Sequence, residues 1–577
     1  MRGLPMTIEL STITFTNGAD IVPQSGEEDI VNTGIANTLA GKDTITGTYL
    51  FNASDLSGRG IENSGTLNTA EGDDIITGRG GWDGAGIYNY ETGTFNTGGG
   101  NDIITAEANK GNAGFENSGT FNAAEGNDTI TGSGTNGEGI HNYDTGTFNT
   151  GEGDDIITGT GGFYNGIVNS GTFNTAEGND QITGTGTYGE GIYNTGTFNT
   201  AKGNDIITAK GDASRGIVNT GTFDTAEGND IITAAGGIGR GIDNTGTFNT
   251  GEGNDIITAK GDYGQGIYNS GTFNTADGND EITGIGSNSD GIKIADGSIL
   301  DTGNGNDRIS GNGGLSTGIY NGSITFNTGD GNDTIEGSGG FNGIKNTGVI
   351  NTGNGKDTII AKGGTFDGKI LAGGLSNFST IDTGNGEDII TASGGIENGG
   401  TIDTGNGDDT ITGSGGFSFL GDDISGISNK GIIDTGNGND EIIADGLFIG
   451  TDGTINTGNG MDTITSSKGI ENHGTINTGN GADFILADGG FKGMGSVLLG
   501  NGKDHLKGFG TGTFKGGNNE DTLELTSGTY TCKIEGTKVS FINSGVIMET
   551  YEFETLIAGS TTYNFTSLTG TETFVVP

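Results

Sequence analysis

Single apolar residues between polar or small neighbours recur along most of the chain, at separations that no amphipathic helix uses. In one unit, Ile167 lies in GIVN, Phe173 in GTFNT and Ile182 in NDQIT, and Ile192 opens the next unit. The separations are 6, 9 and 10 residues, whereas a helix face repeats every 3, 4 and 7. Polar or small residues on both sides of an apolar one are typical of a strand with one buried face. The pattern therefore predicts three short strands per unit, joined by glycine-rich turns.

The unit repeats at a fixed step through the middle of the chain. GTFNT, replaced once by GTFDT, recurs every 25 residues between 146 and 275, and the step outside this block ranges from 21 to 31. A constant period means that each unit meets its neighbour in the same way, which is how a solenoid is built. We therefore predict an all-β, right-handed parallel β-helix, or β-solenoid, of about 20 coils. Differences in coil length are expected in loops, with 361–378 and 414–425 as candidates for segments that bulge from one edge.

Identical stacking of coils about 4.8 Å apart predicts ladders of inward side chains. An asparagine two residues after each isoleucine faces the same way, and stacked amides can hydrogen-bond along the ladder. We interpret these asparagines as structural, with ligand binding as the alternative. The isoleucine ladder comprises Ile167, Ile192, Ile217, Ile242 and Ile267. The other two comprise Phe148, Phe173, Phe198, Phe223, Phe248 and Phe273, and Asn142, Asn169, Asn194, Asn219, Asn244 and Asn269.

Both ends differ from the repeat. Residues 1–36 precede the first clear unit and are expected to cap the solenoid, because an exposed last coil would present unpaired edges. Residues 37–516 carry the repeats. From 517 to 577 glycine becomes rarer and the apolar alternation is that of antiparallel strands, which predicts a separate C-terminal β segment.

Composition and charge narrow the choice of partner. The 74 acidic residues exceed the 24 basic ones and give a net charge of −50, which disfavours binding to nucleic acid and to anionic membrane surfaces and favours cations. No apolar run is long enough to span a bilayer, so no membrane insertion is expected. The first twenty residues lack the apolar stretch of a cleaved signal peptide, and the lone Cys532 is expected to be a buried side chain without a disulfide partner.

A Gly-x-Gly-x-Asp-x-Ile motif precedes the third strand of each unit, as in Gly251, Gly253, Asp255 and Ile257. Calcium takes six to eight oxygen ligands, and a glycine-rich turn can point backbone carbonyls at an ion while aspartate supplies charge. Aspartates stacked about 4.8 Å apart would repel by about 3–4 kcal/mol at an effective dielectric near 20, and a divalent cation between them would reverse the sign. The alternative is that the aspartates cap turns by accepting backbone N–H groups. The predicted metal ligands are Asp74, Asp102, Asp128, Asp155, Asp180, Asp205, Asp230, Asp255, Asp280, Gly303, Gly305, Asp307, Asp333, Asp357, Asp388, Asp409, Asp440, Asp462, Asp483 and Asp504.

These turns resemble the G-G-x-G-x-D-x-U-x nonapeptide of the RTX, or haemolysin-type, calcium-binding family, and this resemblance covers roughly residues 41–508. As a whole, the chain resembles a cyanobacterial-type secreted RTX-like protein. The resemblance implies Ca²⁺ as the cofactor. Each coil carries one motif where the family's coils carry two, so metal is expected on one edge only. The second motif position is alanine in several coils, where a positive φ would be strained. Sites after residue 301, which read TGNGND or close to it, are therefore expected to bind better. The alanines are Ala176, Ala201, Ala226 and Ala276.

RTX proteins exported by type I secretion carry an uncleaved C-terminal signal, and residues 517–577 resemble the C-terminal region of cyanobacterial RTX-like proteins. The resemblance implies a secreted, extracellular or cell-surface protein. The alternative role for this segment is a simple cap, and one segment can do both. Extracellular calcium at millimolar levels suits weak sites.

No catalytic constellation is evident. His141, His473 and His505 belong to different coils, and neither a zinc cluster nor a nucleophile–base pair is present; His505 is interpreted as a solvated turn residue. The main interpretation is a non-enzymatic, calcium-binding surface, matrix or adhesion protein. Its expected partners are calcium ions, a cell-surface polysaccharide or copies of itself. The alternatives are a polysaccharide lyase or epimerase, a carbohydrate-binding protein, and an ice-binding adhesin that uses the threonine ladder Thr150, Thr175, Thr200, Thr225, Thr250 and Thr275.

Overall fold

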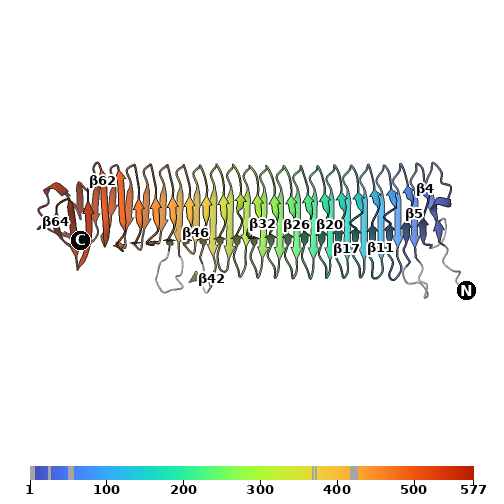
Figure 1. Cartoon of the computed structure of the whole chain (residues 1–577), viewed down its shortest axis with the longest axis horizontal. Helices are drawn as coiled ribbons and strands as arrows, with labels where there is room; N and C mark the ends of the chain where they lie inside the picture. The colour runs from blue at the N-terminus through green and yellow to red at the C-terminus, as the bar shows by residue number, and fades with distance from the viewer. Residues whose placement is uncertain (1–6, 24–27, 50–57, 367–368, 371–372, 416–425) are drawn as a thin grey trace. The chain divides into compact units, whose positions relative to one another are not determined.

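The computed structural model describes residues 7–23, 28–49, 58–366, 369–370, 373–415 and 426–577. The chain divides into two compact units, Met1–Gly303 and Asn304–Pro577. Each unit is a stack of similar coils, drawn as successive arrows in Figure 1. The described residues make about 19 turns of three strands each, so the predicted parallel β-solenoid is confirmed.

One regular coil of the first unit shows how the sequence forms the three walls. Wall 1 contains β21 (Ile192–Asn194), wall 2 contains β22 (Thr197–Asn199) and wall 3 contains β23 (Ile206–Gly211). Each strand pairs in parallel and in register with its equivalent one coil later, so that Ile192 lies opposite Ile217. Because the central residue of the Thr-Phe-Asn strand points inward, Phe198 is fully buried while its two neighbours on the strand face outward.

The predicted inner ladders are confirmed. From Phe148 to Phe273 the rings stack with centroids 4.7–4.8 Å apart, which is the spacing between coils. The asparagine ladder is buried as well, and from Asn117 to Asn269 each Nδ2 donates to the Oδ1 of the next coil's asparagine at 2.8 Å. Each amide thereby satisfies its neighbour, which makes a buried polar row tolerable.

In the first unit the walls begin before the first sequence repeat. The short strands Ile8–Glu9 and Ile21–Val22 pair in parallel with the following coil, and Leu10 of the adjoining 3₁₀ turn η1 (Leu10–Thr12) is fully buried. The first coil therefore lies within the segment 1–36. Wall 1 runs from β1 (Ile8–Glu9) through β3 (Ile30–Asn32) to β33 (Ile292–Ile294), wall 2 from β4 (Ile35–Asn37) to β34 (Ile299–Asp301), and wall 3 from β2 (Ile21–Val22) through β5 (Thr44–Thr48) to β32 (Glu281–Gly286).

In the second unit the three walls end at different positions in the sequence. Wall 1 ends first, whereas walls 2 and 3 continue in parallel beyond residue 517. Wall 1 runs from β36 (Ile319–Asn321) to β59 (Phe491–Lys492). Wall 2 runs from β37 (Thr325–Asn327) through β60 (Ser496–Asn501) and β62 (Gly512–Asn518) to β66 (Val546–Tyr551), and wall 3 from β35 (Arg308–Asn312) through β61 (His505–Lys507) and β63 (Thr522–Leu525) to β67 (Thr555–Ala558).

Among the described residues, antiparallel pairing occurs only in the last segment and in one loop. The predicted antiparallel pairing after residue 517 is confirmed, and Cys532 is buried within it. The candidate bulge at 361–378 contains a small antiparallel hairpin, while most of the candidate at 414–425 lies outside the described residues. The strands concerned are β64 (Gly528–Glu535), β65 (Lys538–Asn543), β68 (Thr561–Asn564), β69 (Thr573–Val576), β42 (Thr365–Phe366) and β43 (Lys369–Ile370), with the 3₁₀ turn η2 (Phe565–Ser567) after β68.

Candidate functional site

The turns between wall 2 and wall 3 form the candidate site, here called the aspartate edge. In a representative coil the turn connects β25 (Thr222–Asp224) to β26 (Ile231–Gly236) and ends at Asp230. The residue two positions before the aspartate has to be glycine. In the next coil this residue is Gly253, and a Cβ on it would lie 1.6 Å from the carbonyl oxygen of Gly228. Backbone therefore packs directly on backbone along this edge.

The second motif position, which is alanine or glycine, has the left-handed conformation that the sequence suggested. Ala176, Ala201, Ala226 and Ala276 have φ of 59–61°, so the expected strain at these alanines is confirmed. In the second unit the same position is glycine throughout the TGNG turns, with φ between 76° and 93° from Gly329 to Gly479. The predicted ligands Gly303 and Gly305 also have positive φ, 75° and 150°.

All the predicted aspartates lie on this edge, and all point inward. From Asp74 to Asp280 in the first unit, and from Asp307 to Asp504 in the second, they are at most 2% exposed. Their Oδ1 atoms accept the backbone N–H of the corresponding aspartate one coil earlier, at 2.6–3.0 Å in both units. The capping of backbone N–H groups that the sequence offered as an alternative therefore does occur, between coils rather than within one turn.

Capping occupies only one of the two carboxylate oxygens. The Oδ2 atoms are buried without a hydrogen-bond partner of normal geometry, although a threonine five residues earlier, such as Thr225 before Asp230, is close enough to favour the ionised form. An ionised carboxylate normally accepts several hydrogen bonds. A buried carboxylate oxygen without such a bond is stabilised by a proton or by a bound cation. The aspartates concerned are Asp74, Asp102, Asp128, Asp155, Asp180, Asp205, Asp230 and Asp255, and in the second unit Asp333, Asp357, Asp388, Asp409, Asp440, Asp462, Asp483, Asp504 and Asp521.

Burial also makes these carboxylates reluctant to ionise. It raises the pKa of Asp205 to about 6, that of Asp230 to about 7 and that of Asp180 to about 8. Neighbouring aspartates add repulsion at Asp180 and Asp230. Near neutral pH a metal-free row would therefore be a mixture of neutral and charged carboxyl groups, held apart from water.

The donor set fits a hard cation. Carboxylate oxygens and the carbonyls of glycine-rich turns are the ligands that calcium prefers. No three His, Cys, Asp or Glu side chains of the described residues converge on one point, so an ion on this edge would take most of its ligands from the backbone. The ligand positions named from the sequence would then contribute one carboxylate per coil.

The row extends beyond the predicted ligands. Asp521 is fully buried, and its Oδ1 accepts the N–H of Asp504 at 3.0 Å, although its turn reads GGNNED rather than Gly-x-Gly-x-Asp. Asp43, at the N-terminal end, donates its N–H to Asp74 and accepts that of Asp20. The Asp-x-Leu or Asp-x-Ile triplet, rather than the glycines, is the signal that would have found both.

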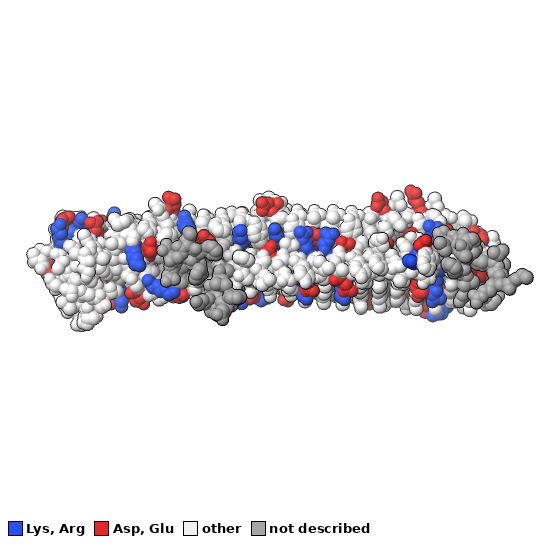
Figure 2. All heavy atoms as spheres, turned by 90° about the horizontal axis from the view of Figure 1, so that it is seen from below, with Lys and Arg blue, Asp and Glu red and all other residues white. Residues whose placement is uncertain are grey.

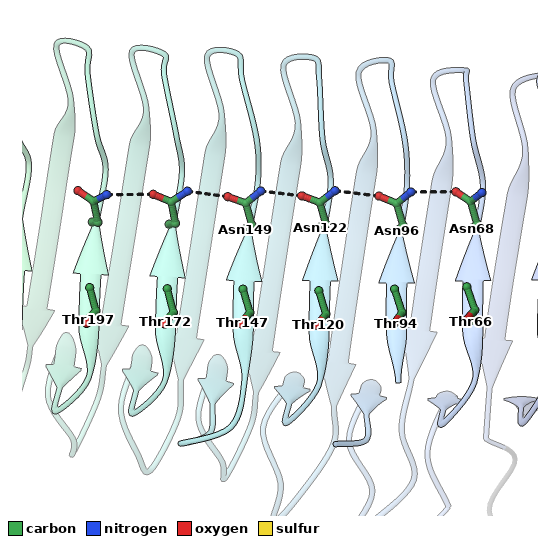
Figure 3. A pocket seen from close by; sticks show the side chains of 12 residues that line it. Thr66, Asn68, Thr94, Asn96, Thr120, Asn122, Thr147, Asn149, Thr172 and Thr197 are labelled. Carbon is green, nitrogen blue, oxygen red and sulfur yellow. Dashed lines mark hydrogen bonds between the residues drawn. The ribbon is translucent and has the colours of Figure 1, made fainter. Parts of the chain in front are cut away.

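The threonine ladder considered for ice binding is in the wrong place. Thr150, Thr175, Thr200, Thr225, Thr250 and Thr275 are fully buried, so the interpretation of this ladder as an outer surface is wrong. Wall 3 has an outward threonine row, as at Thr158 and Thr183. On wall 2 each outward threonine lies two residues before an outward asparagine. Figure 3 shows these two rows, from Thr66 and Asn68 onward, with the asparagine amides hydrogen-bonded along the row. The rows line a shallow groove of about 660 Å³.

The histidines are held by neighbours. His505 is not a solvated turn residue, because it lies in β61 with its Nε2 3.0 Å from Glu524 and its ring against Phe484. His473 is 3.0 Å from Glu471. Burial lowers the pKa of His141 to about 4, so this ring is neutral at physiological pH.

Many basic side chains of the described residues are paired with acidic ones. On the face shown in Figure 2, lysines and arginines lie next to acidic side chains. Pairs such as Lys202–Glu227 at 2.8 Å and Arg308–Glu336 at 2.6 Å connect neighbouring coils.

No family model and no curated protein matches the chain. The chain is similar to a solved structure of a hyperactive, Ca²⁺-dependent, β-helical antifreeze protein from an Antarctic bacterium, with 15% identity over 85% of this chain and 84% of that one. The TM-score is 0.18, so the likeness carries no argument about the site. Within the described residues, no helix is long and apolar enough to cross a membrane.

Proposed function

We propose that the protein is a calcium-stabilised β-solenoid with a structural or adhesive role at the cell surface or in the extracellular matrix. The observation that carries this proposal is the row of buried aspartates, in which the Oδ2 atoms named above are buried without a hydrogen-bond partner of normal geometry. The cap between coils needs one oxygen of each carboxyl group and would be served equally well by asparagine. The second oxygen, which can carry charge, supplies a ligand for a cation.

The regularity of the row supports calcium as a structural ion rather than a catalytic one. Each coil offers one carboxylate at the same height relative to the next, and the glycine-only contact between turns leaves no room for side chains to serve as further ligands. Calcium bound along the edge would neutralise the like charges that stacking brings together. Folding and binding would then be linked, because the site does not exist in the unfolded chain.

Export follows from the same chemistry. Sites built mainly from backbone oxygens and single carboxylates suit the millimolar calcium found outside cells. Residues 517–577, which resemble a type I secretion signal, would direct the chain there while their strands β66 and β67 also extend walls 2 and 3. Fusing residues 517–577 to an unrelated reporter tests this: export by a type I system supports the proposal, and retention of the reporter contradicts it.

The calcium proposal is tested by calorimetric titration and by melting followed by circular dichroism. Calcium should bind to the metal-free protein and raise its melting temperature, with magnesium much less effective because its octahedral preference fits a backbone turn poorly. Absence of heat and an unchanged melting temperature would overturn the proposal. An equal effect of any salt at matched ionic strength would point to screening alone.

A second candidate function rests on the outer rows of wall 2. Threonine and asparagine side chains repeated at the coil spacing offer a regular array of hydroxyl, methyl and amide groups in a shallow groove (Figure 3). Such an array could order water and bind ice. Thermal hysteresis that Thr147→Tyr removes and Thr158→Tyr on wall 3 leaves intact would support this function, and no hysteresis would exclude it.

A further inference from the structure

Two turns between wall 1 and wall 2 depart from the repeat in the same way. In a regular coil the strand Ile-x-Asn is followed by Ser-Gly or Thr-Gly, as at Ser170 and Gly171. The turn after β9 (Ile87–Asn89) instead reads Tyr-Glu-Thr-Gly, and the turn after β15 (Ile140–Asn142) reads Tyr-Asp-Thr-Gly. Each is two residues longer than the regular turn. Two insertions of similar sequence therefore flank one regular coil, one on each side.

Both turns are fastened to the preceding coil by the same contacts. Tyr90 N–H donates to Asn63 O and Gly93 N–H to Tyr90 O, both at 2.8 Å. Tyr143 N–H donates to Asn117 O and Gly146 N–H to Tyr143 O, again at 2.8 Å. The threonines complete the match, because the hydroxyls of Thr92 and Thr145 donate to Ser64 O and Ser118 O at 2.9 and 2.7 Å. The two turns are thus rigid, and the order they need for binding is already present in the fold.

The tyrosines of these turns pack against aromatic residues of wall 1. Tyr90 lies edge-on to Tyr88 with ring centroids 4.4 Å apart, and Tyr143 stacks on His141 at 3.9 Å. Arg59 fixes the first pair, since its guanidinium lies 4.1 Å from the Tyr88 ring centroid and it donates to the Tyr90 hydroxyl at 2.7 Å.

Apart from Arg59, the polar groups around these rings are acidic or neutral. The Tyr90 hydroxyl donates to Glu62 at 2.7 Å, so Glu62 balances the charge of Arg59. Glu91 and Asp144 stand exposed at the tips of the two turns. Between the turns, Glu116 is only 6% exposed, and burial raises its pKa.

Together these residues enclose an open pocket of about 480 Å³, within the range of small-molecule sites. Its lining combines the rings of Tyr88, Tyr90 and Tyr143 with the carboxylates of Glu91 and Asp144. Ser118, from the regular coil between the two turns, contributes to the floor. The pocket lies where the chain passes from wall 1 to wall 2, and so on a different corner of the coil from the aspartate edge.

We propose that these two turns form a binding site for a neutral saccharide. The tyrosine rings offer apolar surface to the C–H groups of a pyranose, and the exposed carboxylates of Glu91 and Asp144 accept hydrogen bonds from sugar hydroxyls. The same two carboxylates disfavour an anionic ligand, because none of the residues that line the pocket is basic. The Arg59 guanidinium already lies over the Tyr88 ring, so a cationic ligand would find no free cation–π contact with that ring. The open side of the pocket would admit one unit of a longer chain.

The test uses the full chain with saturating calcium and a panel of soluble polysaccharides. Laminarin, dextran and mannan serve as neutral probes, alginate as the anionic probe and chitosan as the cationic probe, with binding measured by affinity electrophoresis and calorimetry. At least one neutral probe should bind, and alginate should bind at least tenfold more weakly. Binding of no neutral probe, or of chitosan alone, would overturn the proposal.

Variants locate the site. Replacing Tyr143–Thr145 by a single serine restores the regular turn Asn-Ser-Gly that the neighbouring coil has at 117–119, so this variant should fold and should lose saccharide binding. Tyr143→Ala should weaken binding at least tenfold. Tyr193→Ala is the control, because Tyr193 lies in the outward row of wall 1 that contains Tyr88 and His141, in a coil whose turn to wall 2 is regular. Equal losses in both single variants would overturn the assignment. An unchanged calcium-induced melting shift in each variant separates this result from failure of the calcium proposal.

Discussion

Replacing one aspartate of the row by asparagine should change stability in opposite directions with and without calcium. In Asp230→Asn the amide oxygen can still accept the N–H of Asp205, now 2.8 Å from Oδ1, while the amide nitrogen takes the place of the orphaned Oδ2. The substitution preserves shape and the cap between coils. It removes only the charge and one candidate calcium ligand.

The magnitude follows from the raised pKa of Asp230. Burial moves this pKa from 3.8 to about 7, and a shift of about three units corresponds to about 4 kcal/mol. Since the native state holds the proton more tightly than the unfolded state, the contribution is complete below about pH 4 and is lost as the pH rises through about 7. Asparagine cannot ionise, so in chelator at about pH 8 the variant should be more stable than the parent by up to about 4 kcal/mol.

With calcium the sign should reverse. The parent gains the free energy of binding, whereas the variant lacks a charged ligand at this coil and gains less. The variant should then melt below the parent in millimolar calcium. This reversal distinguishes a cation site from a structural cap, for which asparagine would be neutral or stabilising under both conditions.

The assay is melting followed by circular dichroism at about pH 5 and about pH 8, each with chelator and with calcium. Asp224→Asn is the matched control, because it removes the same charge from the same coil on wall 2, where neighbouring coils already carry Asn199 and Asn249. The reasoning is refuted if Asp230→Asn destabilises the chelated protein at about pH 8, or if the two variants behave alike in all four conditions.

Further predictions concern the whole row, the turn backbone and the asparagine ladder. The chelated parent should melt at a lower temperature at about pH 8 than at about pH 5, because the row loses its protons, and calcium should remove most of the difference; a pH-independent melting temperature would contradict the raised pKa values. Gly253→Ala should cost at least about 3 kcal/mol, since its Cβ would meet the Gly228 carbonyl oxygen at 1.6 Å and force the coils apart; a normal melt would disprove the close contact. Ala201→Gly should instead stabilise by about 0.5–1 kcal/mol by relieving a φ of 61°, less the entropy of the added glycine, and no gain would show that the strain is absent. Asn194→Ala removes bonds of 2.8 and 2.7 Å to Asn219 and Thr222 and should cost about 3–5 kcal/mol, which denaturant unfolding would measure against the exposed Asn204→Ala.

The coil could be predicted from the sequence because its signals are local and repeated. Phe198, Ile192 and Asn194 each recur at a constant step, and a constant step has only one consequence for a stacked chain: equivalent side chains form ladders. The aspartate row could be predicted for the same reason, since Gly-x-Gly-x-Asp places one carboxylate in each coil. Asp521 was missed because its turn keeps the aspartate and Gly517 but has Asn519 in place of the second glycine.

The direction in which a turn residue points could not be predicted so well. Thr150 lies just outside its strand, where the alternation of the strand no longer decides between inside and outside, and packing places it inward. The strand residues Thr147 and Asn149 face outward because Phe148 between them fills the core. The alternation therefore predicted which strand residues point inward. Only the packed structure showed which turn residues do so.

The sequence by itself determined the repeat, the three walls and the positions of the aspartates, because periodicity and alternation act within one coil and are copied to the next. Only the tertiary structure decided that aspartates such as Asp230 accept an N–H group of a neighbouring coil with Oδ1, while Oδ2 is buried without a hydrogen-bond partner of normal geometry. It also brought the turns of Tyr90 and Tyr143 together around Ser118. Both results depend on contacts between coils, and such contacts join residues that are distant along the chain.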